Sequence, residues 1–571
     1  MDLNTFLDHF DTIAEAPSGI AKLKALILDL AVQGKLVPQN PEDETAIKAL
    51  ERMQHEKVGT IQTEGYRTKN KKSSLRSDEY EIAFPLPQGW ALAQLDDLCI
   101  FIDYRGQTPP KVNSGIRLIT AKNVRDGFVK PDPEEFINEE TYHTWMTRGF
   151  PKKGDVLFTT EAPLGKAAVV EIEERFALAQ RVINFRPLSG VYGYFLMWMI
   201  LSSWFQSELQ ERATGMTATG IKAAKLKLIC IPLPPLAEQK RIVEKVDELM
   251  ALCDRLAAAK QTRDDLRQKL RGSAIAALMN AETDEALEKS WAIVRDNWQT
   301  ISQDPKDVDD LRRSNLQLAV KGKLVSQNSE DKLAKLTLSE IAIEQQKLAQ
   351  TGKLKKDNEL AEIKTEDLPS LPEGWEYCYF QDLKTFGPRN GYSPKAVEYP
   401  TSVRSITLTA TTSGRFNGQF FKYIDEQIEN ESYLWLQPGD LLIQRSNTLA
   451  YVGAAAVYDQ PPGKYIYPDL IMRVRLSEKI DVRYIHLFLS SRAGKQHFQS
   501  NASGTSGTMP KINQRVVNSL IVPLPPLAEQ KRIVAKVGEL MQMCDQLEAN
   551  SRQSQQRASA LAASAISHLT I

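Results

Sequence analysis

The sequence predicts an α+β protein built as an internal repeat, with two mixed α/β domains separated by two long helices. Three observations predict it. The stretch IPLPPLAEQKRIVEKVDELMALCDRL at residues 231–256 returns as VPLPPLAEQKRIVAKVGELMQMCDQL at 522–547, with 20 of 26 positions identical. Each copy continues into an apolar stripe with helical spacing. Before each copy, short apolar runs such as GDVLFTT and GDLLIQRS are bounded by glycine, proline and asparagine, which is typical of strands and turns.

Other segments repeat in the same order, so the two halves of the chain are colinear. LAVQGKLVPQNPED at 30–43 matches LAVKGKLVSQNSED at 318–331, and LPQGW ending at Trp90 matches LPEGW ending at Trp375. KKGDVLF in the first half has its counterpart in QPGDLLI in the second. The period of about 290 residues is far longer than the roughly 20–50 residues of a solenoid unit. It indicates two domains of one type, each followed by a helical spacer.

These repeats set the expected domain boundaries. Along the chain we expect a helical segment with its linker, a globular domain, a spacer helix, a second helical segment with its linker, a second globular domain and a last helix. Their expected ranges are 1–84, 85–235, 236–282, 283–369, 370–526 and 527–571. Between the P-x-G-W motif and the PLPPLAEQ box the two domains share turn positions but little else. The segments that border each domain are therefore repeated, while the sequences inside the two domains differ.

The two spacer helices carry matching stripes. Pro232, Pro234 and Pro235 cannot lie inside a helix, so they form an extended lead-in to it. After them, apolar residues alternate at intervals of four and three, the spacing of a coiled-coil seam. The seam residues are Ile242, Val246, Leu249, Cys253 and Leu256 in the first copy, and Ile533, Val537, Leu540, Cys544 and Leu547 in the second. Leu266 and Leu270 extend the first helix, and the alanine-rich SAIAALMNA suggests that it continues to about Ala281. We expect the stripes to pack against each other in an antiparallel intramolecular coiled coil; the alternative is that each helix packs on its own domain.

Composition narrows the class of protein. Apolar residues make up 42% of the chain and charged residues 25%, which is ordinary for a globular protein and argues against disorder as the dominant state. Lys plus Arg and Asp plus Glu both number 72, so a nucleic-acid site must gather its cations locally. The five cysteines form no CxxC pair and are expected to be small buried side chains. The acidic N-terminus and the lack of an apolar run of ~18 residues predict a soluble, cytoplasmic protein.

A search for catalytic motifs finds little. The sequence has no P-loop, no G-x-G-x-x-G after a strand and no G-x-S-x-G elbow. The six histidines are scattered without metal-ligand spacing. The repeated AEQK contains the Glu-x-Lys of many nuclease centres, but Glu238 lies in a first helical turn, where the helix dipole favours an acid. We therefore expect no catalytic residue and no metal site in this chain.

Hydrogen-bonding and cationic side chains gather in turn-rich segments instead. Examples are DYRGQTPPK, RLITAKNVRDG and ATGMTATGIKAAK in the first domain, and GPRNGYSPK, QRSNTLAY and ASGTSGTMPKINQR in the second. Arg, Lys, Asn, Gln and Thr side chains reach base edges and phosphates, and glycine lets a backbone approach a duplex closely. Composition alone leaves plain solvated loops as the alternative.

The doubled PLPPLAEQKRIV box, each copy followed by a heptad helix, together with the LAVQGKLVPQ element, resembles the specificity subunit of type I restriction–modification systems over essentially the whole chain. GMTATGIKAAKLKLICIPLP and GTMPKINQRVVNSLIVPLP are similar to that family's glycine-rich loop and short strand before the box. The resemblance implies two target-recognition domains, each reading half of a bipartite DNA sequence, with the coiled coil setting the gap. It also implies two modification subunits that use S-adenosylmethionine and two restriction subunits that use ATP and Mg²⁺. Under this resemblance the chain itself performs no catalysis and holds no cofactor.

We expect contacts to double-stranded DNA from loop residues of the kinds described above. In the first domain these are Arg105, Gln107, Lys111, Lys122, Asn123, Arg125, Thr217, Thr219 and Lys222. In the second domain they are Arg389, Asn390, Lys395, Arg404, Thr409, Arg445, Asn447, Thr505 and Lys511. Two other functions stay open: a non-enzymatic scaffold whose domains bind polypeptides, and a self-contained enzyme that methylates and cleaves DNA. Missing methyl-donor and Asn-Pro-Pro motifs weaken the second of these.

Overall fold

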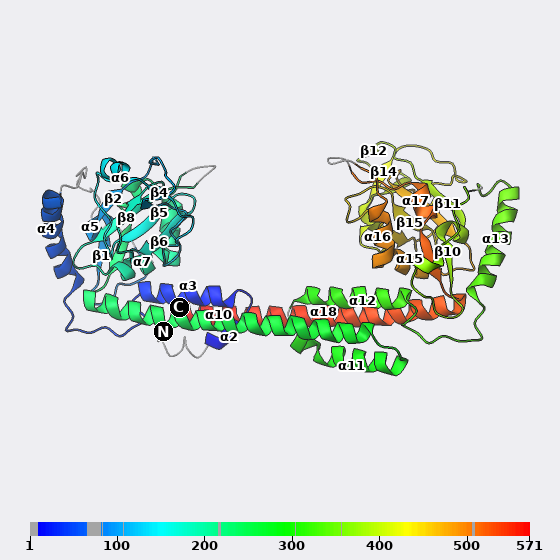
Figure 1. The fold of residues 1–571 in the computed structure, drawn as a ribbon, viewed down its shortest axis with the longest axis horizontal. Coiled ribbons are helices and arrows are strands. Elements are labelled where there is room, and N and C mark those ends of the chain that lie inside the picture. The colour runs from blue at the N-terminus through cyan, green and yellow to red at the C-terminus, as the bar shows by residue number, and fades with distance from the viewer. Residues whose placement is uncertain are drawn as a thin grey trace. The chain divides into compact units, whose positions relative to one another are not determined.

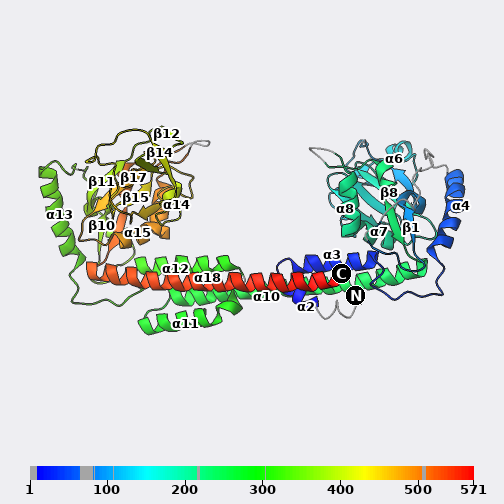
Figure 2. The same ribbon diagram turned by 180° about the vertical axis from the view of Figure 1, so that it is seen from behind.

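The chain folds into two compact units (Figures 1 and 2). The computed structural model describes residues 10–64, 82, 84–106, 108–214, 219–302, 304–355, 357–504 and 509–570. Unit 1 consists of Met1–Thr262 and Gln555–Ile571, and unit 2 consists of Arg263–Ser554. Each unit contains one globular domain, its own short helices and parts of both long helices.

The globular domain of unit 1 is closed by an antiparallel ladder between β1 (Ala91–Gln94) and β9 (Cys230–Leu233), so the chain enters and leaves the domain at one place. The domain holds a four-stranded antiparallel sheet in the order β2-β8-β5-β6 and a three-stranded sheet in the order β4-β3-β7. The strands are β2 (Cys99–Asp103), β3 (Ile116–Ile119), β4 (Phe136–Ile137), β5 (Val156–Thr160), β6 (Leu164–Val169), β7 (Phe176–Leu178) and β8 (Val182–Pro187).

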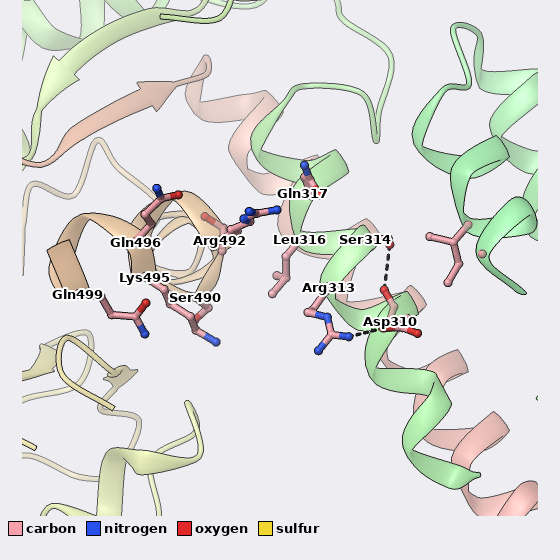
Figure 3. A pocket seen from close by; sticks show the side chains of 13 residues that line it. Asp310, Arg313, Ser314, Leu316, Gln317, Ser490, Arg492, Lys495, Gln496 and Gln499 are labelled. Atoms are coloured by element: carbon pink, nitrogen blue, oxygen red, sulfur yellow. Dashed lines mark hydrogen bonds and ion pairs between the residues drawn. The ribbon is translucent and has the colours of Figure 1, made fainter. Parts of the chain in front are cut away.

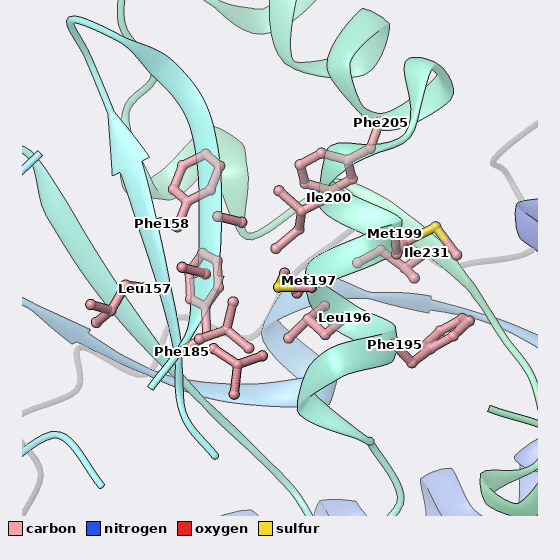
Figure 4. Packing of buried hydrophobic residues seen from close by; sticks show 14 of the residues in the cluster. Leu157, Phe158, Phe185, Phe195, Leu196, Met197, Met199, Ile200, Phe205 and Ile231 are labelled. Carbon is pink, nitrogen blue, oxygen red and sulfur yellow. The ribbon is translucent and has the colours of Figure 1, made fainter. Parts of the chain in front are cut away.

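Unit 1 also contains shorter helices, some before the domain and some within it. They are α2 (Phe10–Glu15), α3 (Gly19–Val32), α4 (Ala46–Glu64), α5 (Leu95–Leu98), α6 (Glu139–Trp145), α7 (Gly193–Leu201), α8 (Ser203–Arg212) and α9 (Ala223–Leu226). The sequence of α7, GYFLMWMIL, is apolar almost throughout, as expected for a buried helix. In Figure 4, Phe158 and Phe185 from the sheet pack with Leu196, Met197 and Ile200 of α7. Because α3 contacts both α7 and α8, the domain core is continuous with the helical segment.

Unit 2 repeats this plan. Its domain is closed by β10 (Glu376–Tyr379) and β18 (Ile521–Leu524), and its sheets have the orders β11-β17-β15-β16 and β12-β14-β13. The strands are β11 (Lys384–Asn390), β12 (Ala396–Val397), β13 (Val403–Ile406), β14 (Phe421–Ile424), β15 (Leu441–Gln444), β16 (Ala455–Val457) and β17 (Ile471–Leu476). The helices are α11 (Asp284–Ile301), η2 (Pro305–Asp307), α12 (Val308–Val320), α13 (Ala334–Gln350), η3 (Thr365–Asp367), η4 (Phe380–Leu383), α14 (Thr409–Thr412), α15 (Val482–Ser490), α16 (Arg492–Ser500) and α17 (Gln514–Asn518). The predicted α+β class is confirmed.

The two spacer helices are α10 (Leu236–Met279) and α18 (Leu527–Thr570), each of 44 residues. At a rise of 1.5 Å per residue, each is about 66 Å long. Unit 1 contains the first part of α10 with the last part of α18, and unit 2 contains the first part of α18 with the last part of α10. Accordingly, Ala562 shares a hydrophobic cluster with Ile242, and Leu278 shares one with Ile533. In each unit the start of one long helix therefore packs with the end of the other, which is the pattern of an antiparallel helix pair, as predicted.

The stripe residues are buried, but they do not pack as the sequence analysis expects. Nine of the ten are buried, and Leu256 is partly buried. The first stripe belongs to the hydrophobic cluster of unit 1 and the second to that of unit 2, so the stripes do not face each other. Both copies occupy the first half of a helix, and antiparallel pairing matches a first half with a last half. The predicted extension of the first helix is confirmed, because α10 continues through Leu266 and Leu270 to Met279, although these two leucines are 54% and 55% exposed.

Each stripe instead packs within its own unit, where the long helix lies along α3 or α12. The polar contacts at these two interfaces are equivalent. Lys24 of α3 pairs with Asp254 of α10 at 2.6 Å, and Arg312 of α12 pairs with Asp545 of α18 at 2.6 Å. The antiparallel pairing of the two long helices is therefore as predicted, while each stripe is covered within its own unit and does not meet the other stripe.

The repeated GKL motif ends the short helix of each unit at the P-x-G-W motif. Gly34 after α3 and Gly322 after α12 adopt the left-handed conformation, with φ of 67° and 65°. The next backbone N–H bonds to the carbonyl five residues earlier, at 2.9 and 3.1 Å, which closes the helix end. A Cβ on Gly34 would lie 2.5 Å from Cγ of Pro87 and 3.0 Å from the Trp90 ring, and one on Gly322 would lie 2.4 Å from Cγ of Pro372. The motif therefore needs glycine for both conformation and space.

The AEQKR box secures the same junction from the long helix. Buried Gln239 accepts a hydrogen bond from the Tyr192 N–H at 2.8 Å and donates one to the Gly190 carbonyl at 2.9 Å. Arg241 pairs with Asp43 at 2.8 Å, which ties the helix to the segment after the GKL motif. The equivalent partners in unit 2 are Gln530 with Asp481, and Arg532 with Asp331. The segments that repeat in the sequence thus meet in space as one joint in each unit.

The glutamates of the box are structural residues of this joint. Glu238 and Glu529 are each 1% exposed, and burial raises the pKa of both carboxyls. Lys240 and Lys531, two positions further on, are exposed. The Glu-x-Lys pairs therefore do not converge on one site.

The cysteines behave as predicted. All five are buried with free thiols. Burial raises the pKa of Cys230 and Cys544 to about 11, so both stay protonated and unreactive near neutral pH. Within the described part of the chain, no helix combines the length and apolar character needed to cross a membrane.

Candidate nucleic-acid interface

A buried aspartate anchors the central strand of both domains. In unit 1, Asp155 precedes β5, accepts a hydrogen bond from Nδ2 of Asn184 at 2.8 Å and pairs with Arg186 at 3.0 Å. In unit 2, Asp440 precedes β15 and pairs with Arg475 at 2.6 Å. These aspartates are the D of the repeated G-D pair, and buried charges of this kind need such partners. The anchor fixes the positions of β5 and β15 in their sheets.

The glycine-rich loops are held just beyond the ends of these strands. The isolated antiparallel bridges at their bases join Gly220 to Glu161 and Thr214 in unit 1, and Lys511 to Ser446 and Ser503 in unit 2. The loop residues between them, with the predicted contacts Thr217 and Thr505, lie outside the described residues, as does Gln107. The two domains therefore support one glycine-rich loop each at equivalent positions.

Three predicted contacts of the first domain meet at the base of its loop. The guanidinium of Arg105 pairs with Asp103 at 2.6 Å and donates a hydrogen bond to the Ile221 carbonyl at 3.2 Å. Thr219 and Lys222, on either side of this contact along the chain, are exposed. The arginine is oriented by its carboxylate, and the threonine and lysine remain accessible to a ligand.

Four cations surround a hollow of about 620 Å³ beside this loop: Lys122, Arg125, Lys130 and Lys166. We name this set the basic hollow. Lys166 is held by Asp126 at 2.6 Å. Lys122 and Arg125 are among the contacts predicted from the sequence, whereas Lys130 and Lys166 are not, because an isolated lysine in a strand or before a proline carries no pattern of its own.

Carboxylates hold some of the neighbouring cations. Glu135 pairs with Lys111 at 2.8 Å and lies 3.6 Å from Lys122. Among the described residues, exposed Lys130 makes no ion pair. A phosphate entering the basic hollow would therefore meet Lys130 without displacing a carboxylate.

Asn123 is not available as a DNA contact. It is 1% exposed, and its Oδ1 accepts the Thr120 N–H at 3.1 Å. Its Nδ2 donates to the carbonyls of Lys130 and Pro133, both at 3.2 Å. Because the loop backbone uses both ends of the amide, Asn123 positions Lys130 and does not reach outward.

In the second domain, Arg445, Asn447 and Lys511 come together just after β15. The backbone of Arg445 is fixed on both sides, since its N–H donates to the Leu470 carbonyl at 2.8 Å and its carbonyl accepts the Ile512 N–H at 2.9 Å. In the part of the chain that the structure describes, its guanidinium has no hydrogen-bond or ion-pair partner. A fixed backbone with an unpaired guanidinium is well suited to contact a base or phosphate.

A buried glutamine links Asn447 to a short helix. Nδ2 of Asn447 donates to Oε1 of Gln444 at 2.6 Å, and Nε2 of Gln444 donates to the hydroxyls of Thr411 and Thr412 at 2.9 and 3.0 Å. The predicted contact Thr409 begins this helix, α14, and is exposed. The network fixes Asn447 and α14 relative to the end of β15.

The remaining predicted contacts of this domain come from other elements. Arg389 of β11 lies 3.3 Å from the ring centre of Tyr433, and Arg404 of β13 lies 5.1 Å from that of Phe421. Such stacking orients a guanidinium while leaving its N–H edge free. The last two are Lys395, which is exposed, and Asn390, whose Oδ1 is buried without a hydrogen-bond partner among the residues that the structure describes.

Cationic and amide side chains thus surround the base of one glycine-rich loop in each domain. This combination suits the phosphates and base edges of a nucleic acid. Across the described ranges, no cluster of histidine, cysteine, aspartate and glutamate could hold a metal ion.

Comparison with known proteins places the chain in a family. Residues 87–263 and 372–555 match the family described as "Type I restriction modification DNA specificity domain". The chain is 29% identical to the type I restriction enzyme EcoEI specificity subunit of Escherichia coli, with 94% of this chain and 92% of that protein covered. It is 30% identical to the EcoAI specificity subunit of Escherichia coli, with 93% and 90% covered.

Solved structures match over 85% of this chain. One, from work on complex assembly and conformational transition of the type I R-M system, has a TM-score of 0.47 at 17% identity, with 98% of its chain covered. Another, the HsdS subunit from Thermoanaerobacter tengcongensis, has a TM-score of 0.41 at 16% identity, also with 98% covered. The doubled family match and the two full-length relatives show that this chain belongs to the type I restriction–modification DNA specificity family.

Proposed function

We propose that this chain recognises a bipartite DNA target, with one half-site contacted by each globular domain. One observation carries the proposal. The two domains hold a glycine-rich loop on the same bridged base beside the same anchored strand, yet surround it with different cations and amides. Loops that are held in the same way but surrounded by different side chains are suited to two domains that recognise two different DNA sequences. Family membership favours this function over a protein-binding scaffold or a self-contained enzyme.

The long helices are proposed to set the gap between the half-sites. They are equal in length, at 44 residues each, and each contributes to both units. A straight helix resists bending, and half-sites read by paired modules lie about one or more turns of DNA apart. The number of helical residues between the two domains is therefore expected to determine the number of unspecified base pairs.

The chain is proposed to direct other subunits and to perform no catalysis itself. Its relatives are named as specificity subunits of type I restriction enzymes. The expected partners are two modification subunits that use S-adenosylmethionine and two restriction subunits that use ATP and Mg²⁺, all acting in the cytoplasm. This chain is expected to supply the DNA contacts and the spacing.

The test is to map methylated adenines in a host that expresses this chain with its modification subunit. The expected result is one bipartite motif with a constant gap. As a control, exchange of residues 85–235 for those of a relative is expected to change one half-site and leave the other half-site and the gap unchanged. A contiguous motif, or the loss of both half-sites on exchange in a folded protein, would contradict the proposal.

A further inference from the structure

A groove in unit 2 lies between α12 and α16, beside the contact of α12 with α15 (Figure 3). It consists of two adjoining hollows of about 700 and 480 Å³, which share Gln317, Ser491, Arg492 and Gln496. We call it the α12–α16 groove. Its sides come from the helical segment and from the globular domain of the same unit, so it lies at the joint that the repeated motifs build.

The larger hollow carries unpaired positive charge. Arg492 and Lys495 line it from one face of α16, and neither makes an ion pair among the described residues. The carboxylate in the lining, Asp310, already pairs with Arg313. Three cations against one carboxylate leave this hollow with a surplus of two positive charges.

The smaller hollow is largely apolar. Its lining includes Val320, Leu368, Leu371, Phe488 and Ile521. A sugar–phosphate backbone has no apolar side group that could cover such a wall. A polypeptide can place an apolar side chain there and a carboxylate beside the two cations of α16, which buries apolar surface and pairs the charges together.

At the corresponding place in unit 1 the two helices are in direct contact. Asp29 of α3 accepts a hydrogen bond from the hydroxyl of Ser203, the first residue of α8, and α3 contacts α8 directly. The repeat puts Gln317 at the position of Asp29, and Arg492 is the first residue of α16 as Ser203 is of α8. A short hydrogen-bonded pair in one half is thus replaced by two long side chains that line a groove in the other.

We propose that the α12–α16 groove docks an acidic, partly apolar polypeptide segment of a partner subunit, and that this docking occurs on the second half of the chain alone. The surplus charge is complementary to carboxylates, and the apolar wall to a side chain of the same segment. The inference rests on the proposed assembly with modification and restriction subunits. It adds a protein-binding site that the repeat itself does not predict.

The test uses the full chain assembled with its modification and restriction subunits. A photo-crosslinking benzoylphenylalanine replaces Gln499, which lines the groove, and in a matched control it replaces Gln210, the equivalent eighth residue of α8. The expected result is a crosslink from position 499, mapped by mass spectrometry to an acidic segment of a partner subunit, and none to that segment from position 210. Assembly without a crosslink at 499, or equal crosslinks from both positions, would overturn the inference while leaving the proposed function intact.

Charge reversal provides the second arm. R492E/K495E is expected to lower the yield of this crosslink at least tenfold, whereas R483E, at an exposed arginine of α15 outside the groove lining, is expected to leave it unchanged. An unchanged yield in the double variant rejects the charge argument and the inference with it. If position 499 crosslinks to an added 30-base-pair duplex and not to protein, the groove binds DNA, and the inference is also rejected. Failure of the wild-type chain to assemble at all would remove the proposed partners together with the inference.

Discussion

The two halves of the molecule are alike where the chain is anchored and unlike where it is exposed to a ligand. Asp155 and Asp440 anchor equivalent strands, and Gly34 and Gly322 end equivalent helices against the same proline–tryptophan pair. Around the loops the halves diverge, with a basic hollow in unit 1 and, in unit 2, a guanidinium at Arg445 that has no partner among the described residues. We infer that stability depends on the repeated anchors, while recognition depends on loop side chains that can be exchanged without disturbing those anchors.

The largest effect is expected from changing the long helices. Inserting a heptad into both α10 and α18 adds about 10 Å, or about three base pairs, and is expected to lengthen the gap while leaving both half-sites unchanged. Inserting it into α10 alone breaks the match between two helices of 44 residues and is expected to abolish specific methylation. Mapping methylated adenines in both variants distinguishes them. An unaltered gap in the double insertion would remove the helices as the spacing element.

The second largest effect is expected from removing the buried aspartates Asp155 and Asp440, which tests whether they stabilise their two domains equally. D440A leaves Arg473, which is 4% exposed, without its carboxylate, and is expected to destabilise the second domain by about 3–5 kcal/mol. D155A is expected to have a similar effect on the first domain, and exposed D459A very little. Hydrogen exchange of the strands in each domain measures the loss separately. A large loss in one domain only would show that the two aspartates are not equivalent.

Glycine substitutions separate conformational strain from lack of space. Gly322 and Gly352 have φ of 65° and 70°, but a Cβ on Gly322 meets Pro372 whereas one on Gly352 meets nothing within 4 Å. G322A is therefore expected to cost about 1–3 kcal/mol more than G352A, because of overpacking at the joint. G34A is expected to match G322A, and urea unfolding monitored by hydrogen exchange checks all three. Equal losses for G322A and G352A would mean that the joint can relax.

Recognition variants are expected to affect one half-site or none. R445A removes a guanidinium held on a fixed backbone and is expected to weaken discrimination at one half-site by about 1–3 kcal/mol. K130A, in the basic hollow, is expected to weaken binding about equally for all sequences and to reduce the salt dependence by about one phosphate contact. Fluorescence anisotropy of the assembled complex on matched and mismatched duplexes measures both. A uniform loss for R445A would assign it to the phosphate backbone.

The smallest effect is a difference in pH dependence between the domains. Burial lowers the pKa of His486 and His497 below the ordinary 6.5, and both lie in the second domain. Below pH 6.5 the unfolded chain takes up protons that the folded domain does not, so stability falls as pH drops from 6.5 toward the lower folded pKa. Each histidine contributes at most about 1.4 kcal/mol per pH unit. Hydrogen exchange of the second domain at pH 7.5 and 5.5 measures the loss, which H486N/H497N is expected to reduce.

Much of the architecture could be predicted from the sequence, because segments that occur twice in the same order mark the equivalent elements of the two halves. Twenty identities in 26 positions locate the two long helices, and proline punctuation locates their starts near Leu236 and Leu527. The burial of the stripes also follows from their spacing. The elements that cover the stripes could not be predicted, because an apolar stripe indicates that it is buried but does not indicate which element packs on it. Here α3 and α12 cover the stripes, and the later halves of the long helices complete the clusters.

The interface was less predictable. Loop composition suggested Arg445 and Lys222, which lie at the bases of the loops, and also Asn123, whose amide turns inward to the loop backbone. It did not suggest Lys130 and Lys166, which line the basic hollow. Side chains of the same type can face solvent or backbone, and only the three-dimensional path of the loop decides which.

The internal repeat is enough to predict two domains of one type with long helices between them, and the doubled box indicates the family, because neither depends on knowing any contact. The folded chain alone reveals which helix covers each stripe, which cations share a hollow, and that a groove separates α12 from α16 where α3 and α8 touch. These features depend on packing between residues far apart in the chain, and such packing follows from the shapes and volumes of the side chains that meet.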